Sequence, residues 1–320
     1  MRCTACQWGI WKTRSVPGTA DSHVASVAAE GRPKVLYVMG AGRSGSTILG
    51  VALGNCEGIF FAGELDRWIA RAGVPRDGRE RRRFWAGVRT QVEQAPELAG
   101  GRATVLERSS ALLDPRRWPA RRRLRRRYRQ ISEQLYRAIA PAAEAQIIVD
   151  SSHYPLRARE LQALSGIDLH LLLLVRDPQD VVASLGRRDV PERRFGLLAA
   201  NAYLWLTCAL SVLVFRRHPA ARRMLVRHED FLADPARVIG EILSLCGSAA
   251  RPPDFSALHT GVPFHGNRLI NSSVVALGTH AAARARSSRI TTLLQGPWAK
   301  VLSRLRPVAA ERSGSPAEGL

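Results

Sequence analysis

The stretch "VLYVMGAGRSGSTILG", residues Val35–Gly50, contains the features that decide the fold. An apolar run ends at Gly40, and a turn rich in glycine and serine then leads into a second apolar segment. Glycines allow a tight turn that presents backbone N–H groups to an anion, and the N-terminus of a following helix adds its positive dipole end. The stretch therefore predicts a buried strand, a phosphate-binding loop and a helix. Loops of this kind that hydrolyse nucleotides carry a lysine at the position that Ser46 occupies here.

The rest of the chain alternates short apolar runs with segments of helical pattern. After a first strand over 34–40, the apolar runs span residues 58–63, 145–150, 169–177 and 222–230. The helical segments span residues 47–55, 64–72, 155–164, 178–187 and 235–246. Apolar strands that are separated by helices indicate a parallel sheet covered on both faces. We therefore expect a single α/β domain of the P-loop type over residues 32–306, with a central parallel sheet flanked by helices and with ligands at the carboxyl ends of the strands.

Residues 76–130 interrupt this alternation with a helical insertion that is dense in arginine, most of all in "DPRRWPARRRLRRRYRQ" (114–130). These arginines are either solvated or part of a lid or anion contact near the acceptor, and the lack of a clear periodicity favours the solvated alternative. Residues 1–31 and 307–320 are expected to be a disordered leader and a disordered tail. The leader contains the pair Cys3 and Cys6, but no second pair of ligands follows, so we expect no structural zinc site.

The composition is strongly basic, with a formal net charge of +21 that comes almost entirely from arginine. Such a surface attracts anions: nucleotides, acidic sugars, nucleic acid or an anionic membrane face. Few aromatic residues stand between the clustered arginines, so we expect no platform for stacking nucleic-acid bases and no nucleic-acid partner. Cys56, Cys208 and Cys246 lie among apolar residues and indicate buried thiols in a reducing compartment, here taken as the cytoplasm.

Residues 195–215, "FGLLAANAYLWLTCALSVLVF", form a segment of 21 residues without a charge. This length is sufficient for a membrane-spanning helix. The segment also contains Asn201, Thr207 and Ser211, and an expected strand of the same sheet follows it. These observations favour a buried central helix of a soluble domain. They leave open a peripheral contact between surface arginines and the inner face of a membrane.

A second motif, "LLLLVRDPQDVVAS" (171–184), places charged and hydroxyl side chains at another strand end. Arg176 ends the expected strand, Pro178 suits the first turn of a helix, and Ser184 lies further along that helix. Arg176 and Ser184 are therefore able to converge on one anion. The alternative is that the Arg-Asp-Pro sequence is only an ordinary helix start.

The two motifs together resemble the bacterial type of the sulfotransferase superfamily, whose members use 3′-phosphoadenosine-5′-phosphosulfate (PAPS) as donor. The resemblance extends over residues 34–306, through "FFAGELDRW", "IIVDSSHYPLRARELQAL", "LVRHEDFLADPARVIGEILSLCG" and "HGNR" in the expected order. It implies that Arg176 and Ser184 bind the 3′-phosphate. It also implies that the first loop binds the 5′-phosphosulfate through Gly42, Arg43, Ser44, Gly45, Ser46 and Thr47. Because no γ-phosphate has to be held, the lysine is not needed.

Sulfuryl transfer needs in-line geometry, positive charge on the leaving phosphate and a base near the acceptor hydroxyl. Arg43 is expected to supply charge, and Glu64, at the end of the strand over 58–63, is the expected base. We expect this strand to lie beside the first loop, so that Glu64 points into the same crevice. The alternative is that Glu64 only complements the dipole of the helix over 64–72. In related bacterial sulfotransferases the acid of a "GE" motif at this point serves as the base.

His153 is a third candidate catalytic residue. It ends "DSSH" (150–153), where related sequences commonly have lysine. His153 acts either as an acid toward the leaving group or as a cap of the helix that begins at Pro155. Ser151 and Ser152 are candidates to contact the transferring group, and Ser152 is an equally good helix N-cap.

Two further positions depart from the pattern of the resembling family. His228, in "RHED", stands where an aromatic residue is usual, which puts its role near the adenine in doubt. Arg268, in "GNR", stands where proline is usual, and it is a candidate ligand of the 3′-phosphate.

The expected function is transfer of a sulfuryl group from PAPS to a hydroxyl of a carbohydrate, lipid or small molecule, without a metal. The alternative is a P-loop kinase-like phosphotransferase, which would bind ATP and need magnesium. Asp150 is the nearest candidate carboxylate for that metal, and Ser46 in the lysine position argues against this alternative. The sequence determines neither the acceptor nor the oligomeric state.

Overall fold

The structure is a computed structural model, and it describes residues 31–76, 78–186, 196–278 and 288–305. The described residues do not include the expected tail, Phe195, or nearly all of the expected leader, in which Cys3 and Cys6 lie.

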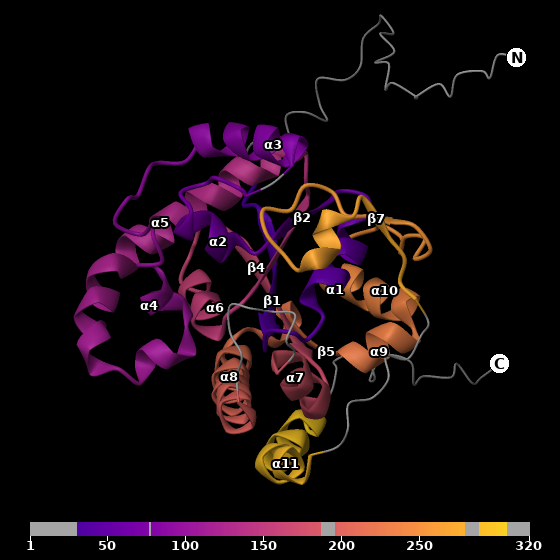
Figure 1. Cartoon of the computed structure of the whole chain (residues 1–320). Helices are drawn as coiled ribbons and strands as arrows, with labels where there is room; N and C mark the ends of the chain where they lie inside the picture. The colour runs from indigo at the N-terminus through magenta and orange to yellow at the C-terminus, as the bar shows by residue number, and fades with distance from the viewer. Residues whose placement is uncertain (1–30, 77, 187–195, 279–287, 306–320) are drawn as a thin grey trace, which may run out of the picture. The chain divides into compact units, whose positions relative to one another are not determined.

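The described domain is built around one sheet of five parallel strands in the order β2-β3-β1-β4-β5 (Figure 1). The strands are β1 (Lys34–Gly40), β2 (Ile59–Gly63), β3 (Ile147–His153), β4 (Asp168–Val175) and β5 (Arg223–Arg227). A short antiparallel pair, β6 (Leu258–His259) and β7 (Val274–Val275), lies apart from this sheet. The predicted α/β class with a central parallel sheet is confirmed.

Helices cover both faces of the sheet because successive residues of each strand point to opposite sides. In β1, Tyr37 and Met39 pack into one apolar cluster, and Leu36 and Val38 pack into the other. The first cluster is covered by α2 (Leu65–Ala70), α3 (Arg79–Thr90), α5 (Trp118–Ala142), α6 (Pro155–Leu161) and the end of α8 (Leu197–Arg217). The second is covered by α1 (Ser46–Gly54), α9 (His228–Ala233) and α10 (Pro235–Leu245). Figure 1 shows the sheet between these two layers.

Two strand boundaries differ from the expected ones. β3 continues to His153, which pairs with Met39 after a register shift, so "DSSH" belongs to the strand and does not follow it. β5 ends at Arg227, and His228 begins α9, so the strand expected over 222–230 is too long. In both cases the pairing partner decides the end of the strand, and that partner is distant in the sequence.

The arginine-rich insertion is helical, as expected, and comprises α3, α4 (Thr104–Glu107) and α5. Several of its arginines bind carboxylates of the same domain. Arg125 and Arg129 both pair with the buried Glu160, and Arg127 pairs with Glu97 at 3.1 Å. The two contacts with Glu160 attach the insertion to the rest of the domain, whereas Glu97 lies within the insertion itself. The contacts with Glu160 favour a structural role over a lid.

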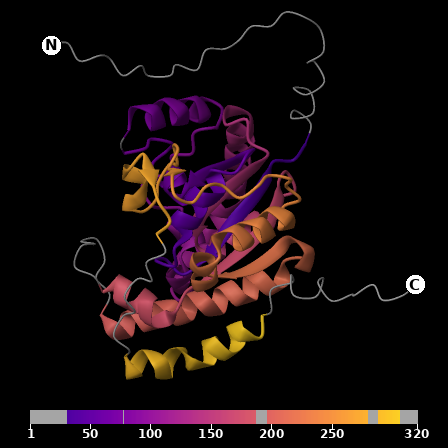
Figure 2. The ribbon, with the colours of Figure 1, turned by 90° about the vertical axis from the view of Figure 1, so that its right-hand side faces the viewer.

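Helix α8 is not the buried central helix that the uncharged segment predicted. One side packs against β1, β4 and α6, and only 39% of its most apolar stretch is buried. Among the described helices it alone is long and apolar enough to cross a membrane. Figures 1 and 2 show α8 at one side of the domain, in contact with α7 (Pro178–Leu185) and α11 (Arg289–Ser303). The sheet face that α8 covers is already shared with four other helices, so α8 shields only part of it.

Candidate active site

The predicted phosphate loop, residues Gly40–Ser46, follows the central strand β1 and leads into α1. Arg43 and Gly45 both adopt left-handed backbone conformations, with φ of 72° and 93°. Gly45 is the N-cap of α1 and no side chain caps this helix. Helix N–H groups without a side-chain cap are suited to bind an anion. Ser44 and Thr47 are buried in the loop, and Ser46 is half-buried.

Arg176 joins the second motif to this loop. Its Nη1 donates a hydrogen bond to the backbone oxygen of Arg43 at 3.3 Å. Its Nη2 lies 3.3 Å from Oδ2 of Asp180 in α7, and Ser184 lies one turn further on the same side of that helix. The Nε of Arg176 is buried and has no hydrogen-bond partner among the described residues. The helix also has an ordinary start, because Asp177 caps it. The convergence of Arg176 and Ser184 on one anion stays a prediction.

His228 packs directly against the loop. A Cβ at Gly45 would overlap the ring of His228, so only glycine leaves room for it. The ring is buried, and burial, followed by the charge of Arg176, lowers the pKa of His228. The neutral ring therefore takes the place of the aromatic residue that is usual in the resembling family.

The "GNR" segment also reaches the loop. The backbone N–H of Asn267 donates to Oγ1 of Thr47 at 3.3 Å, and the exposed Arg268 follows at once. This contact brings the segment that carries Arg268 to the start of α1, and the role of Arg268 as a ligand of the 3′-phosphate stays a prediction.

The carboxylate of Glu64 lies between two basic side chains. Its Oε2 is 3.6 Å from Nε of Arg67 and 3.9 Å from Nε2 of His265. Burial, followed by the charge of Asp66, raises the pKa of Glu64 to about 7. Glu64 is the N-cap residue of α2, but its side chain makes no capping hydrogen bond. Its carboxylate is therefore not committed to the helix start.

His153 lies next to the loop. It ends β3, the strand that pairs with β1, and it lines a small hollow with Gly40, Ala41, Ser44 and Ser46. Burial, followed by the charge of Arg67, lowers the pKa of His153 to about 4, so the ring is neutral near pH 7. A neutral ring can donate a hydrogen bond but is a poor acid. The N-cap of α6 is Tyr154, so His153 does not cap that helix.

Glu64 and the loop do not lie on adjacent strands. β2 pairs with β3, and β3 pairs with β1, so one strand separates them. The expectation that β2 lies beside the loop is wrong. Because neighbouring strands are about 4.8 Å apart, roughly 10 Å separates the ends of β2 and β1.

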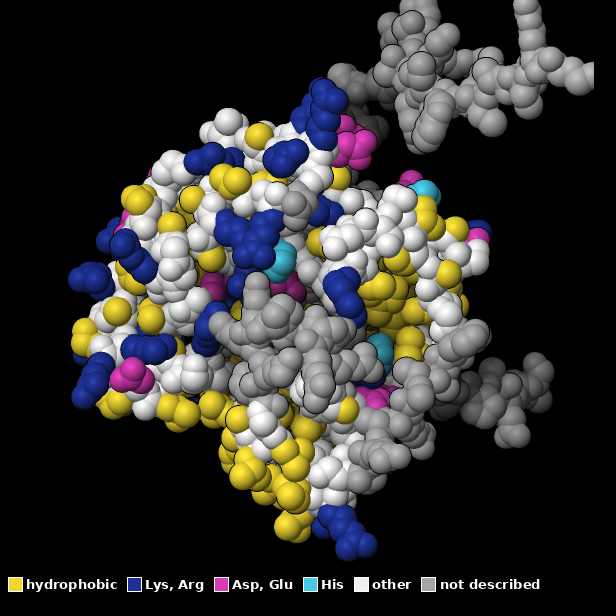
Figure 3. Space-filling view, in the orientation of Figure 1, with side chains coloured by type: hydrophobic (Ala, Val, Ile, Leu, Met, Phe, Trp, Pro, Cys, Tyr) yellow, Lys and Arg dark blue, Asp and Glu magenta, His cyan; other side chains and the backbone are white. Residues whose placement is uncertain are grey.

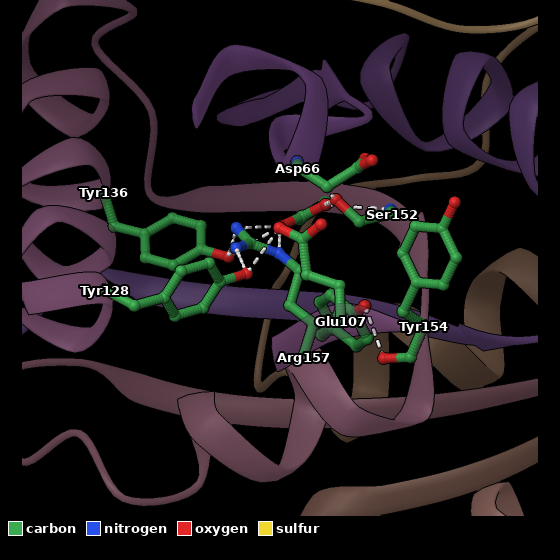
Figure 4. A network of polar contacts seen from close by, with 9 residues as sticks. Asp66, Glu107, Tyr128, Tyr136, Ser152, Tyr154 and Arg157 are labelled. Atoms are coloured by element: carbon green, nitrogen blue, oxygen red, sulfur yellow. Dashed lines mark hydrogen bonds and ion pairs between the residues drawn. The ribbon is translucent and has the colours of Figure 1, made fainter. Parts of the chain in front are cut away.

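A buried polar network around Arg157 lies beside Asp66 and Ser152 (Figure 4). Asp150 and Arg157 are completely buried and form an ion pair, with Nη2 of Arg157 3.0 Å from Oδ2 of Asp150. Tyr136 donates to the same Oδ2 at 2.6 Å, and Nη1 of Arg157 donates to the hydroxyl of Tyr128 at 2.6 Å. Tyr128 in turn donates to Glu107 at 2.9 Å. Asp150 is therefore occupied by this network and is not open to a metal ion.

Ser152 connects the network to α2. Its Oγ accepts from the backbone N–H of Asp66 at 3.1 Å, and its own N–H donates to Asp150. Ser152 thus binds a backbone N–H in the first turn of α2 and does not cap α6, because β3 places it beneath α2. Ser151 and Ser152 are both completely buried, so the expectation that they contact the transferring group is not supported.

Two residues of the site were not predicted as site residues, although His265 begins the "HGNR" stretch. The hydroxyl of Tyr203, in α8, accepts from the backbone N–H of Gly42 at 3.0 Å. The backbone oxygen of His265 accepts from the N–H of Glu64 at 2.9 Å. Both are far from their partners in the chain, so only the tertiary structure reveals them.

No three His, Cys, Asp or Glu side chains of the described residues are grouped so that they could hold a metal ion. Independence from metals stays a prediction.

Comparisons with known proteins bear on the family and the fold of the chain. A family model described as "Sulfotransferase family" matches residues 34–252. No curated protein matches the chain. Among solved structures, the chain is similar to the sulfotransferase domain from the curacin biosynthetic pathway, with a TM-score of 0.50 and 15% identity over 83% of this chain and 98% of that one. This likeness supports the fold.

Two further structures match less closely. The sulfotransferase domain of the Synechococcus PCC 7002 olefin synthase has a TM-score of 0.48 and 18% identity, over 84% of this chain and 96% of that one. A sulfotransferase from Alicyclobacillus acidocaldarius has a TM-score of 0.41 and 15% identity, over 86% of this chain and 94% of that one. The family match covers more than half of the chain and includes the loop, Glu64, His153, Arg176 and Ser184. The chain therefore belongs to the sulfotransferase family.

Proposed function

We propose that this protein transfers the sulfuryl group of PAPS to a hydroxyl group of an acceptor. The observation that supports this most is the contact between the two motifs, in which Arg176 donates to the backbone of Arg43 in a loop without lysine. The uncapped start of α1 suits one anionic group, and the buried, unpartnered Nε of Arg176 suits another. A donor with a phosphosulfate and a separate 3′-phosphate presents two such groups.

In the proposed reaction, the bond between the sulfur and the 5′-phosphate oxygen of the donor breaks, and a bond between the sulfur and the acceptor oxygen forms. The acceptor proton passes to a base on the protein. Arg43 and the N–H groups at the start of α1 stabilise the negative charge that develops on the leaving phosphate. Adenosine 3′,5′-bisphosphate is the second product.

Glu64 is the proposed base. A base works best when its pKa is near the working pH, and the pKa of Glu64 is about 7. His153 is one strand nearer to the loop, but its pKa of about 4 makes it a weak base. We assign His153 the role of a hydrogen-bond donor in the hollow beside the loop. The acceptor hydroxyl would then lie between the ends of β2 and β1.

Several observations bear on the alternatives. A P-loop kinase would use a loop lysine and a carboxylate for magnesium, whereas this loop has Ser46 and Asp150 is paired with Arg157. Arginines of the insertion pair with carboxylates of the domain, which disfavours a nucleic-acid partner.

The described cysteines are free, as suits the proposed cytoplasmic location. A carbohydrate, a lipid or a small molecule would each provide a suitable hydroxyl.

Binding of the second product tests this proposal without an acceptor. Adenosine 3′,5′-bisphosphate, added without magnesium, should raise the melting temperature, since a ligand at a hundred times its Kd stabilises the folded state by about 2.7 kcal/mol. Arg176→Ala should remove most of the shift. Arg82→Ala, which changes an exposed arginine of α3, should keep it. If ATP with magnesium stabilises the protein better than the bisphosphate, the sulfotransferase proposal is wrong.

A further inference from the structure

Helix α11 buries polar side chains and exposes apolar ones, which is the reverse of a helix on a surface that faces water. Its polar residues Thr291 and Gln295 are buried, and both bind Asn201 of α8. Its apolar residues Ile290 and Leu293 are 46% and 79% exposed. A helix that faces water normally buries its apolar side and exposes its polar side.

Helix α8 shows the same arrangement. It buries Thr207 and Ser211, whereas Leu198, Trp205 and Leu213 are 68%, 47% and 45% exposed. The spacing of these three residues, seven and then eight, places them on one stripe of the helix. Much of the polar content of both helices is thus directed inward and much of their apolar content outward.

The two stripes form one apolar surface, which we call the α8–α11 face. The helices run side by side in the same direction, because Asn201 contacts Thr291 and Trp205 stacks edge-on against Trp298 at 5.3 Å between the ring centroids. Figure 2 shows the pair as the outermost layer on this side of the domain, and Figure 3 shows hydrophobic side chains gathered over it. The face consists of Leu198, Trp205, Leu213, Ile290, Leu293 and Leu294.

The charged residues of the two helices themselves have a single sign. Neither helix contains an aspartate or a glutamate. Exposed cations stand where the two helices end, and they are Arg216, Arg217, Lys300 and Arg304. An apolar surface with tryptophan at its centre and cations where its two helices end matches the boundary of an anionic lipid bilayer.

We propose that the α8–α11 face is a membrane-docking surface that lies on an anionic bilayer without crossing it. The other side of α8 packs on the sheet, so the helix cannot be surrounded by lipid while the domain stays folded. A second copy of the chain is a poorer occupant, because the charges that α8 and α11 contribute are all positive, so two copies of this face would repel each other. This inference does not depend on the identity of the donor or the acceptor.

Co-sedimentation of the full chain with vesicles tests the proposal. The wild-type protein should bind vesicles that contain phosphatidylglycerol more tightly than vesicles of phosphatidylcholine alone. The double variant Leu198→Ser/Leu293→Ser should bind the anionic vesicles at least about tenfold more weakly, because it removes two apolar side chains that would enter the bilayer. Leu113→Ser is the matched control, since Leu113 is 70% exposed and lies outside the face.

The leucine comparison distinguishes docking from general electrostatic attraction, to which leucines contribute nothing. Equal binding by the double variant and Leu113→Ser would overturn the proposal. So would a wild-type dimer that the double variant converts to a monomer without any change in vesicle binding, because the face would then belong to a second copy.

A second readout leaves the leucines intact: lipids with brominated tails should quench tryptophan fluorescence, and Trp205→Phe should remove a large part of that quenching. Unchanged quenching in Trp205→Phe would count equally against docking by this face.

Discussion

Glu64 and His153 end neighbouring strands, and burial moves their pKa values in opposite directions. Burial disfavours the charged form of any group, so it raises the pKa of the carboxyl to about 7 and lowers that of the imidazole to about 4. Near neutral pH, Glu64 is therefore able to exchange a proton while His153 stays neutral. The charge of Arg67, which lies beside Glu64, opposes the rise of the Glu64 pKa and adds to the fall of the His153 pKa.

The base assignment predicts the effect of Glu64→Gln. This change keeps the shape of the side chain and removes its basicity, so turnover should fall by about 10²–10⁴. The Kd of adenosine 3′,5′-bisphosphate should stay the same, because the carboxylate faces the acceptor side. Turnover needs labelled donor and an acceptor found by screening sugars, lipids and phenols. Full turnover in Glu64→Gln, together with a loss in His153→Ala, would assign the base to His153 instead.

The pH profile provides a check on the same residue. An ionised base is required, so kcat/KM should fall about tenfold per pH unit below the pKa of Glu64, which is about 7. A base with the pKa of His153 would instead leave the rate flat down to about pH 5.

At the scale of elements, the site depends on how β1 turns into α1 under the ring of His228. Gly45 has a left-handed φ of 93°, and a side chain there would overlap that ring. Both constraints act on the same residue, and together they hold the N-terminus of α1 open toward the ligand. The loop is therefore shaped by α9, which comes from a distant part of the chain.

Gly45→Ala should destabilise the protein by more than about 1 kcal/mol, since alanine is strained at this φ and its Cβ meets the ring. It should also abolish the thermal shift with the bisphosphate. Gly87→Ala is the matched control, because Gly87 lies inside α3 with open space around it, and alanine there should stabilise the helix slightly. Urea unfolding measures both changes. In the double variant Gly45→Ala/His228→Ala, part of the lost stability should return; no recovery would show that the overlap is unimportant.

At the scale of the whole molecule, the buried network holds the inserted helices to the sheet. Arg157 of α6 contacts Tyr128 of α5 and Asp150 of β3, and Tyr128 contacts Glu107 of α4. The network has more carboxyl groups than cations in its interior. Burial, followed by the charge of Asp66, therefore raises the pKa of Glu107 from 4.5 to about 8.

This shift makes the stability of the domain depend on pH. The unfolded chain loses the proton of Glu107 above about pH 4.5, whereas the folded protein keeps it up to about pH 8. The stabilisation is therefore complete below the lower value and is lost as the pH rises through the higher one. The free energy of unfolding should fall by more than about 1 kcal/mol between the two values for this residue alone.

In Glu107→Gln this part of the pH dependence should disappear, because glutamine does not ionise and still accepts from Tyr128. Glu57→Gln, at an exposed position, should leave the dependence as in the wild type. Denaturant unfolding at several pH values measures both variants. An equally steep pH dependence in Glu107→Gln would show that other groups cause it.

The sequence by itself determined the α/β class and the glycine-rich loop between β1 and α1, and it supplied the motif around Arg176 and the candidate base, because each depends on a local pattern of apolar, glycine or charged residues. Tertiary structure decided what depends on distant partners. The pairing of β3 between β1 and β2 puts His153, and not Glu64, next to the loop. The same pairing buries Asp150 and Ser152, and the packing of α8 on α11 turns the polar residues of both helices inward. An uncharged segment looks the same in sequence whether sheet or lipid will cover it, since only the packed neighbours define its buried side.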